Sequence, residues 1–336
     1  MFLLAHEPYP LTIDMMMNRR CTIFLLPLVV LLLLGCTHKD LDFSDRAAVL
    51  ISYDWSRSPE ASPEMMRAAV FSDNVQPVFF PFSGSQGGTV DLSKGHTYSF
   101  IGYNSDTEYI YTSGSTYGTF EFCCQPTELA TFSPMFAPRR AGGSEAPRAI
   151  GSETLEIVAE PDPLWYAVAP NVAINGSEVI NMPMQSAVHY YTFTIKSVQN
   201  LSNVQEILAT LSGMSMSFNP SLGRCTQTNC IIPFKMESTA DNELRGTLRS
   251  FGYFPKAEYE LEDTKSLVIY VQTGDGRRIY YTFDVTQALD EAAANPGSSD
   301  VAIELKELPI PKPITNGSGF HPSVEGWQEV QVDIDL

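Results

Sequence analysis

Apolar and polar residues alternate with a period of two along many short segments of the chain. In residues 48–55, Val49, Ile51 and Tyr53 share one face of the pattern, with Leu50 and Ser52 on the other. This period places alternate side chains on the same side of a β-strand. Turn-forming residues separate further strand-like runs, at residues 68–71, 76–82, 88–92, 98–103 and 108–112.

The second half of the chain shows the same pattern from residue 191 onward. Residues 266–285 predict a β-hairpin that turns at Gly274-Asp275-Gly276. Residues 204–218 are ambiguous, because the spacing of their first apolar residues also suits a short helix. With no convincing long amphipathic helix elsewhere, we predict an all-β fold built from sandwiches.

Residues 134–151 interrupt this pattern. They contain three prolines, three glycines and the Arg139-Arg140 pair, with few periodic apolar residues. We predict a long exposed loop, open to trypsin-like cleavage, rather than a domain boundary.

The final segment, residues 329–336, alternates up to its last residue. A strand in this position pairs within its own sheet or remains available to the sheet edge of another molecule. An ordinary last strand is the simpler interpretation, and the segment is also a candidate donor strand. Its apolar positions are Val330, Val332, Ile334 and Leu336.

An apolar run of 14 residues, 21–34, follows Arg19-Arg20 and leads into Gly35-Cys36. It is shorter than the roughly 20 residues that a membrane-spanning helix needs, and the basic pair precedes it as in a signal peptide. We predict that residues 1–36 are a lipoprotein signal, that translation starts near Met17, and that Cys36 receives the lipid. A plain secretory signal or an uncleaved anchor are the alternatives, and residues 37–46 form a polar tether.

The chain has 39 acidic and 21 basic residues, a formal net charge of −18. Such a surface repels nucleic acid and anionic membranes, so we expect no nucleic-acid partner. We expect outer-membrane lipid to be a partner only through Cys36.

The cysteines and histidines do not have the spacing of a metal site or a catalytic site. Cys225 and Cys230 are candidates for a disulfide that closes a hairpin loop, while Cys123 and Cys124 are read as one buried and one partly exposed thiol. No nucleophile motif or phosphate-binding loop is present, so we expect no enzyme activity, no cofactor and no metal. Residues 104–108 are read as a polar turn rather than a calcium loop.

Several motifs, taken in order, resemble the lipid-anchored fimbrillin-like proteins of the Bacteroides group, specifically the domain of unknown function 5119 family, which is related to type V pilins. These motifs include residues 33–36 (LLGC), 53–55 (YDW), 87–92 (GGTVDL), 103–108 (YNSDTE), 163–165 (PLW), 191–195 (YTFTI), 211–214 (LSGM), 283–286 (FDVT) and 319–322 (GFHP).

The resemblance implies two tandem transthyretin-like or Ig-like β-sandwiches, which we place at residues 47–180 and 181–336. It also implies an outer-membrane lipoprotein exposed at the cell surface. In such relatives a trypsin-like protease removes the first strand, and a strand from the next subunit takes its place. Arg46 is then the candidate processing site, and the expected role is pilus subunit, anchor or adhesin, with other pilus subunits as partners. The alternative is a surface lipoprotein that binds a glycan or host ligand without polymerising.

Overall fold

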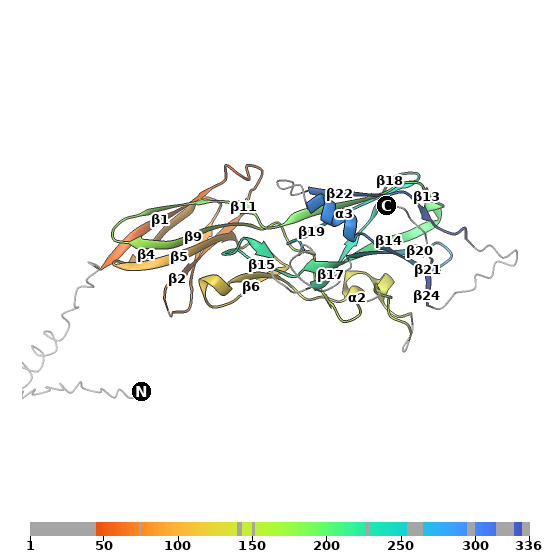
Figure 1. Cartoon of the computed structure of the whole chain (residues 1–336), viewed down its shortest axis with the longest axis horizontal. Coiled ribbons are helices and arrows are strands. Elements are labelled where there is room, and N and C mark those ends of the chain that lie inside the picture. Colours follow the sequence, from red (N-terminus) through yellow and green to blue (C-terminus); the bar gives the residue numbers. More distant parts are fainter. Residues whose placement is uncertain are drawn as a thin grey trace, which may run out of the picture. The chain divides into compact units, whose positions relative to one another are not determined.

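The computed structural model describes residues 45–330 apart from 74, 140–142, 150–151, 226–228, 254–264, 294–299 and 314–325. In this part the chain is mostly β, with several sheets and short helices (Figure 1). The β fold class expected from the alternating pattern is confirmed. The described residues from Arg46 onward belong to one compact unit.

The first strand, β1 (Arg46–Asp54), lies in the middle of a three-stranded sheet that we call sheet A. It pairs in parallel with β10 (Val179–Pro183) and antiparallel with β4 (Gly87–Ser93). The strand predicted at residues 48–55 is therefore confirmed.

Sheet A packs on one face of the five-stranded sheet B, and the four-stranded sheet C packs on the other. Ring contacts join the layers: Tyr53 meets Phe82 between sheets A and B, and Tyr103 meets Phe122 between sheets B and C. Sheet B consists of β11 (Gln185–Ser186), β9 (Trp165–Ile174), β5 (His96–Asn104), β2 (Met65–Phe71) and β3 (Val78–Ser83). Sheet C consists of β16 (Arg224–Cys225), β15 (Ser217–Asn219), β7 (Glu121–Cys124) and β6 (Ile110–Ser113).

The later part of the chain forms the six-stranded sheet D, which faces the four-stranded sheet E. Phe193 of sheet E and Phe234 of sheet D pack with ring centroids 5.6 Å apart. Sheet D consists of β24 (Trp327–Glu329), β21 (Arg278–Asp284), β20 (Ser266–Thr273), β14 (Val204–Ser215), β17 (Asn229–Lys235) and β8 (Glu156–Ile157). Sheet E consists of β18 (Glu237–Ala240), β19 (Glu243–Ser250), β12 (His189–Ile195) and β22 (Asp300–Leu305), and β13 (Val198–Gln199) pairs separately with β23 (Leu308–Pro309).

The helices are short. The α-helices are α2 (Leu129–Phe132) and α3 (Thr286–Ala293), and the 3-10 helices are η1 (Tyr117–Thr119), η2 (Pro134–Phe136) and η3 (Leu201–Asn203). The sequence pattern did not predict α3. The short helix considered near residue 204 is replaced by β14, a strand of 12 residues between β17 and β20.

The prediction of an exposed loop at residues 134–151 is partly wrong. Met135 and Phe136 are buried, as are Ala146 and Ala149, and all four pack against the outer face of sheet D. The Tyr270 hydroxyl donates a hydrogen bond of 2.7 Å to the carbonyl of Pro147. The described part of this segment therefore covers the sheet, because sheet D carries apolar side chains on both faces.

Candidate functional site

The slot that β1 fills in sheet A is the candidate functional site. Val49 lies opposite Val90 of β4, and Ile51 lies opposite Ile180 of β10. Among the described strands, β4 and β10 each pair with β1 and not with each other. Without β1, they would border a groove with two unpaired strand edges.

The inward side chains of β1 are almost fully buried. Val49 and Ile51 have no exposed surface, and Tyr53 is 4% exposed. Burying an apolar side chain of this size contributes on the order of 1.5–3 kcal/mol. The groove is therefore apolar and needs an alternating strand to cover it.

The two ends of β1 differ in how they are held. At the start, Arg46 is exposed and donates a hydrogen bond of 2.6 Å to the carbonyl of Asp91. Beyond the end, the Trp55 indole donates to the carbonyl of Ser85 at 2.8 Å and packs edge-on against Trp165. Arg57 follows in an exposed turn.

The structure corrects the position inferred for Arg46. This residue is the first residue of β1 rather than a residue before it, and its backbone lies opposite Ser93. A cut after Arg46 would leave Ala47–Asp54 in the sheet. Arg57, which the sequence reasoning missed, is the exposed arginine on the far side of β1.

The C-terminal segment begins on the edge of sheet D. β24 pairs in parallel with β21, and the backbone amide of Val330 donates to the carbonyl of Tyr280 at 3.1 Å. Trp327 packs against Tyr270 and lies under the guanidinium of Arg278. The other candidate donor positions, Val332, Ile334 and Leu336, lie outside the described residues.

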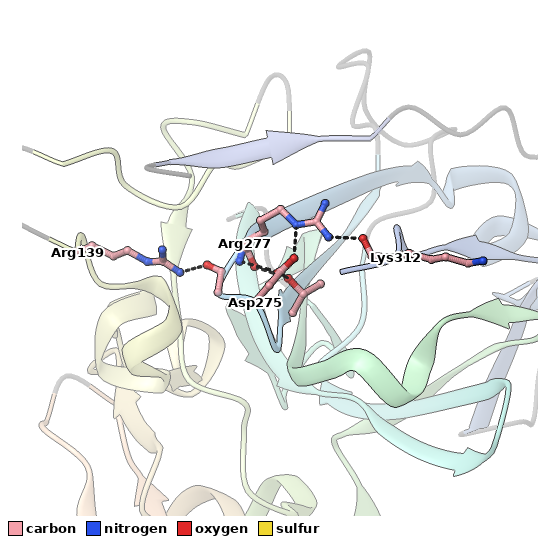
Figure 2. Close-up of polar contacts among 6 residues, drawn as sticks. Arg139, Asp275, Arg277 and Lys312 are labelled. Carbon is pink, nitrogen blue, oxygen red and sulfur yellow. Dashed lines mark hydrogen bonds and ion pairs between the residues drawn. The ribbon is translucent and has the colours of Figure 1, made fainter. Parts of the chain in front are cut away.

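The turn between β20 and β21, which confirms the predicted hairpin, is tied to segments distant in sequence (Figure 2). Asp275 and Arg277 form an ion pair of 3.0 Å, and their side chains are 6% and 8% exposed. Arg277 also donates to the carbonyl of Lys312 at 2.7 Å, and Arg139 donates to the carbonyl of Gly276. The turn is therefore hydrogen-bonded both to Arg139, in the segment that covers sheet D, and to the backbone at Lys312.

The disulfide considered between Cys225 and Cys230 is not formed, since both residues are free thiols. Cys225 lies in sheet C and donates to the carbonyl of Phe251 at 2.6 Å, whereas Cys230 lies in sheet D. The prediction that one of Cys123 and Cys124 is partly exposed is also wrong, because both residues are buried.

No group of three or more His, Cys, Asp and Glu side chains suited to a metal ion occurs within the described ranges. The segment at 104–108 is held by its own contacts. Asn104 donates to Asp106 at 2.9 Å and accepts from the backbone amide of Trp165 at 2.8 Å.

No helix in the described part of the chain is long and apolar enough to cross a membrane. Cys36 and the predicted signal lie outside the described residues.

A family model described as a domain of unknown function, DUF5119, matches residues 35–235. The chain belongs to the DUF5119 family. The family expected from the motifs is therefore confirmed, and no curated protein matches this DUF5119 chain.

Solved structures similar to this DUF5119 protein include a candidate adhesin from Bacteroides ovatus. It is 20% identical with a TM-score of 0.56, over 90% of this chain and 98% of that chain, a likeness of fold. The fimbrial anchor protein Mfa2 from Porphyromonas gingivalis is 13% identical with a TM-score of 0.46, over 78% and 90% of the two chains. A candidate polysaccharide-binding protein from Bacteroides thetaiotaomicron is 12% identical with a TM-score of 0.45, over 78% and 89%.

Proposed function

We propose that this protein is a cell-surface lipoprotein of the fimbrillin type, acting as a pilus subunit, anchor or adhesin that assembles by β-strand complementation. The central, buried position of β1 between β4 and β10 carries the proposal. Replacing such a strand restores main-chain hydrogen bonds on both sides and refills the apolar groove. A strand at a sheet edge would restore only one row.

We place the protein in two tandem β-sandwiches, with sheets A and B in the first and sheets D and E in the second. β10 and β11 pair with β1 and β9, and we therefore propose a boundary after Ser186 in place of residue 180. Core side chains from both sides of this boundary join one apolar cluster, which would hold the two sandwiches together.

The proposed donor is the alternating segment from Val330 to Leu336 of a neighbouring subunit. Its apolar residues recur at every second position, as do Val49, Ile51 and Tyr53 in β1. An alternating strand presents these residues to one face, which is what the groove requires. Lipid on Cys36 would hold the precursor in the outer membrane before assembly.

Release of β1 requires a cut on its C-terminal side. We propose Arg57 as the site, because the residue is exposed and a cut after it separates Arg46–Asp54 from the rest of the chain. The Arg46 site expected from the resemblance would free only the tether.

The test treats purified full-length protein with a trypsin-like protease and follows the N-terminal fragment by mass spectrometry and oligomers on unboiled detergent gels. The protein should form a ladder, which Arg57→Gln abolishes and the matched control Arg46→Gln preserves. Deleting residues 329–336 should also abolish the ladder. A ladder that survives both Arg57→Gln and the deletion of residues 329–336 would contradict assembly by strand complementation. The absence of a ladder from the unaltered protein would contradict it as well.

A further inference from the structure

A hollow of about 450 Å³ lies beside the hairpin of β18 and β19, far from β1 in the sequence. Besides Glu160, Phe234 and Gly246, its lining combines two cations, a carboxylate, two hydroxyl groups and one aromatic ring. These groups belong to Lys235, Arg245, Glu237, Thr239, Thr247 and Phe132. Small-molecule sites combine an apolar wall with a few polar groups, and in this hollow the polar groups predominate.

The charges in this hollow are not neutralised by close ion pairs. Arg245 lies directly opposite Glu237 across the β18–β19 ladder, but neither side chain forms an ion pair within the described residues. Lys235 is exposed and has no such partner there either. Glu160, which also lines the hollow, is already paired with Arg249 at 2.8 Å.

With Glu160 paired to Arg249, the charges left in the lining are two positive and one negative, in a chain whose formal net charge is −18. A guanidinium and an ammonium group beside one hollow favour a carboxylate, which accepts charge-assisted hydrogen bonds from both. The remaining carboxylate and hydroxyl groups suit a ligand that is rich in hydroxyls.

The hollow lies against the buried side chain of Phe234. A side chain added at Gly246 would place its Cβ 2.9 Å from Phe234 Cε2 and 3.0 Å from the carbonyl oxygen of Lys235. Glycine therefore lets β19 lie close over the ring. The half-buried Phe132 adds a second aromatic ring at the wall, suited to the C–H face of a sugar.

We infer that this hollow binds a sugar residue that carries a carboxylate, with Lys235 and Arg245 holding the carboxylate and Glu237 and Thr247 meeting ring hydroxyls. This site goes beyond the proposed assembly and does not rest on it, because its lining comes from sheets D and E, Phe132 and Glu160 and includes no residue of β1.

The test measures binding of glucuronic acid to the full chain by titration calorimetry or ligand-observed NMR, with glucose as the neutral control and acetate as the bare anion. Glucuronic acid should bind in the millimolar range, and glucose and acetate about tenfold or more weakly, because each lacks one half of the recognised chemistry. Lys235→Gln with Arg245→Gln should weaken glucuronic acid binding by about tenfold or more, since two charge-assisted hydrogen bonds are lost.

Lys306→Gln is the matched control, because Lys306 is exposed and lies outside the hollow. It should bind glucuronic acid as the unaltered protein does. Failure to saturate in the millimolar range, equal binding of glucose or acetate, or unchanged binding by the double variant would overturn the inference. The strand-exchange ladder remains a separate readout, so the two proposals fail independently.

Discussion

Tyr53 and Gly102 lie against each other between sheets A and B. A Cβ added at Gly102 would lie 2.5 Å from Tyr53 Cε1, and the sulfur of Met182 would be 3.2 Å away. The absence of a side chain at Gly102 of β5 thus leaves room for the Tyr53 ring on the inner face of β1. Its role is space rather than backbone freedom.

Gly102→Ala should therefore destabilise the protein by about 1–3 kcal/mol, the usual cost of overpacking a core. Urea unfolding monitored by fluorescence measures the change. Gly118→Ala is the control, since a Cβ there would meet no atom within 4 Å. Equal stability of the two variants would show that the Tyr53 ring has room to move.

Tyr53→Phe should leave stability unchanged or raise it by up to about 1 kcal/mol, because the hydroxyl is buried without a hydrogen-bond partner among the described residues. Burial also raises the pKa of this phenol. Tyr281→Phe should instead destabilise, since that hydroxyl donates to the carbonyl of Pro309 at 2.9 Å. The same unfolding assay compares them, and a marked loss of stability in Tyr53→Phe would contradict the prediction.

Lys265 carries a buried ammonium group whose side chain is 2% exposed. It forms an ion pair of 2.9 Å with Asp290 of α3 and lies over the ring of Tyr253. Asp290→Asn should destabilise by up to about 3 kcal/mol, because it leaves a buried charge without its counterion. Lys265→Met should cost less, since the remaining Asp290 is 33% exposed and keeps some hydration. Denaturant midpoints give the order, and the reverse order would disprove this explanation.

His189 should make stability depend on pH below about 7.5, where the imidazole of the unfolded chain begins to take up a proton. Burial lowers the pKa of its imidazole below the ordinary value of about 6.5, so the unfolded chain takes up the proton first. Stability should consequently fall as the pH drops through this range, and His189→Gln should reduce the fall. Asp54 and Glu178 have lowered pKa values through backbone hydrogen bonds, and their contribution is lost only at more acidic pH. Identical pH profiles for the two proteins would refute the assignment to His189.

The four cysteines of the described region should react slowly with a thiol reagent at about pH 8, because burial keeps them protonated. Burial raises the pKa of Cys123 to about 11 and that of Cys225 to about 12. Unfolding should expose all four thiols, identified by peptide mass spectrometry. Recovery of Cys123 and Cys124 alone would instead indicate a Cys225–Cys230 disulfide.

The sequence by itself determined the β character, because a period of two at residues such as Val49, Ile51 and Tyr53 fits a half-buried strand and no helix. It also determined the hairpin around Asp275, where turn residues separate two alternating runs. These signals are local, since they depend on neighbours a few residues apart.

Tertiary structure alone decided which strands are neighbours. The pairing of β1 with β10 joins residues more than a hundred positions apart, and no local pattern indicates it. The burial of Phe136 was missed for the same reason, because its partner Tyr270 comes from a distant strand. The groove around β1, the position of Arg57 beyond it and the hollow beside Arg245 all depend on long-range packing, whereas alternation only specifies which face of each strand is apolar.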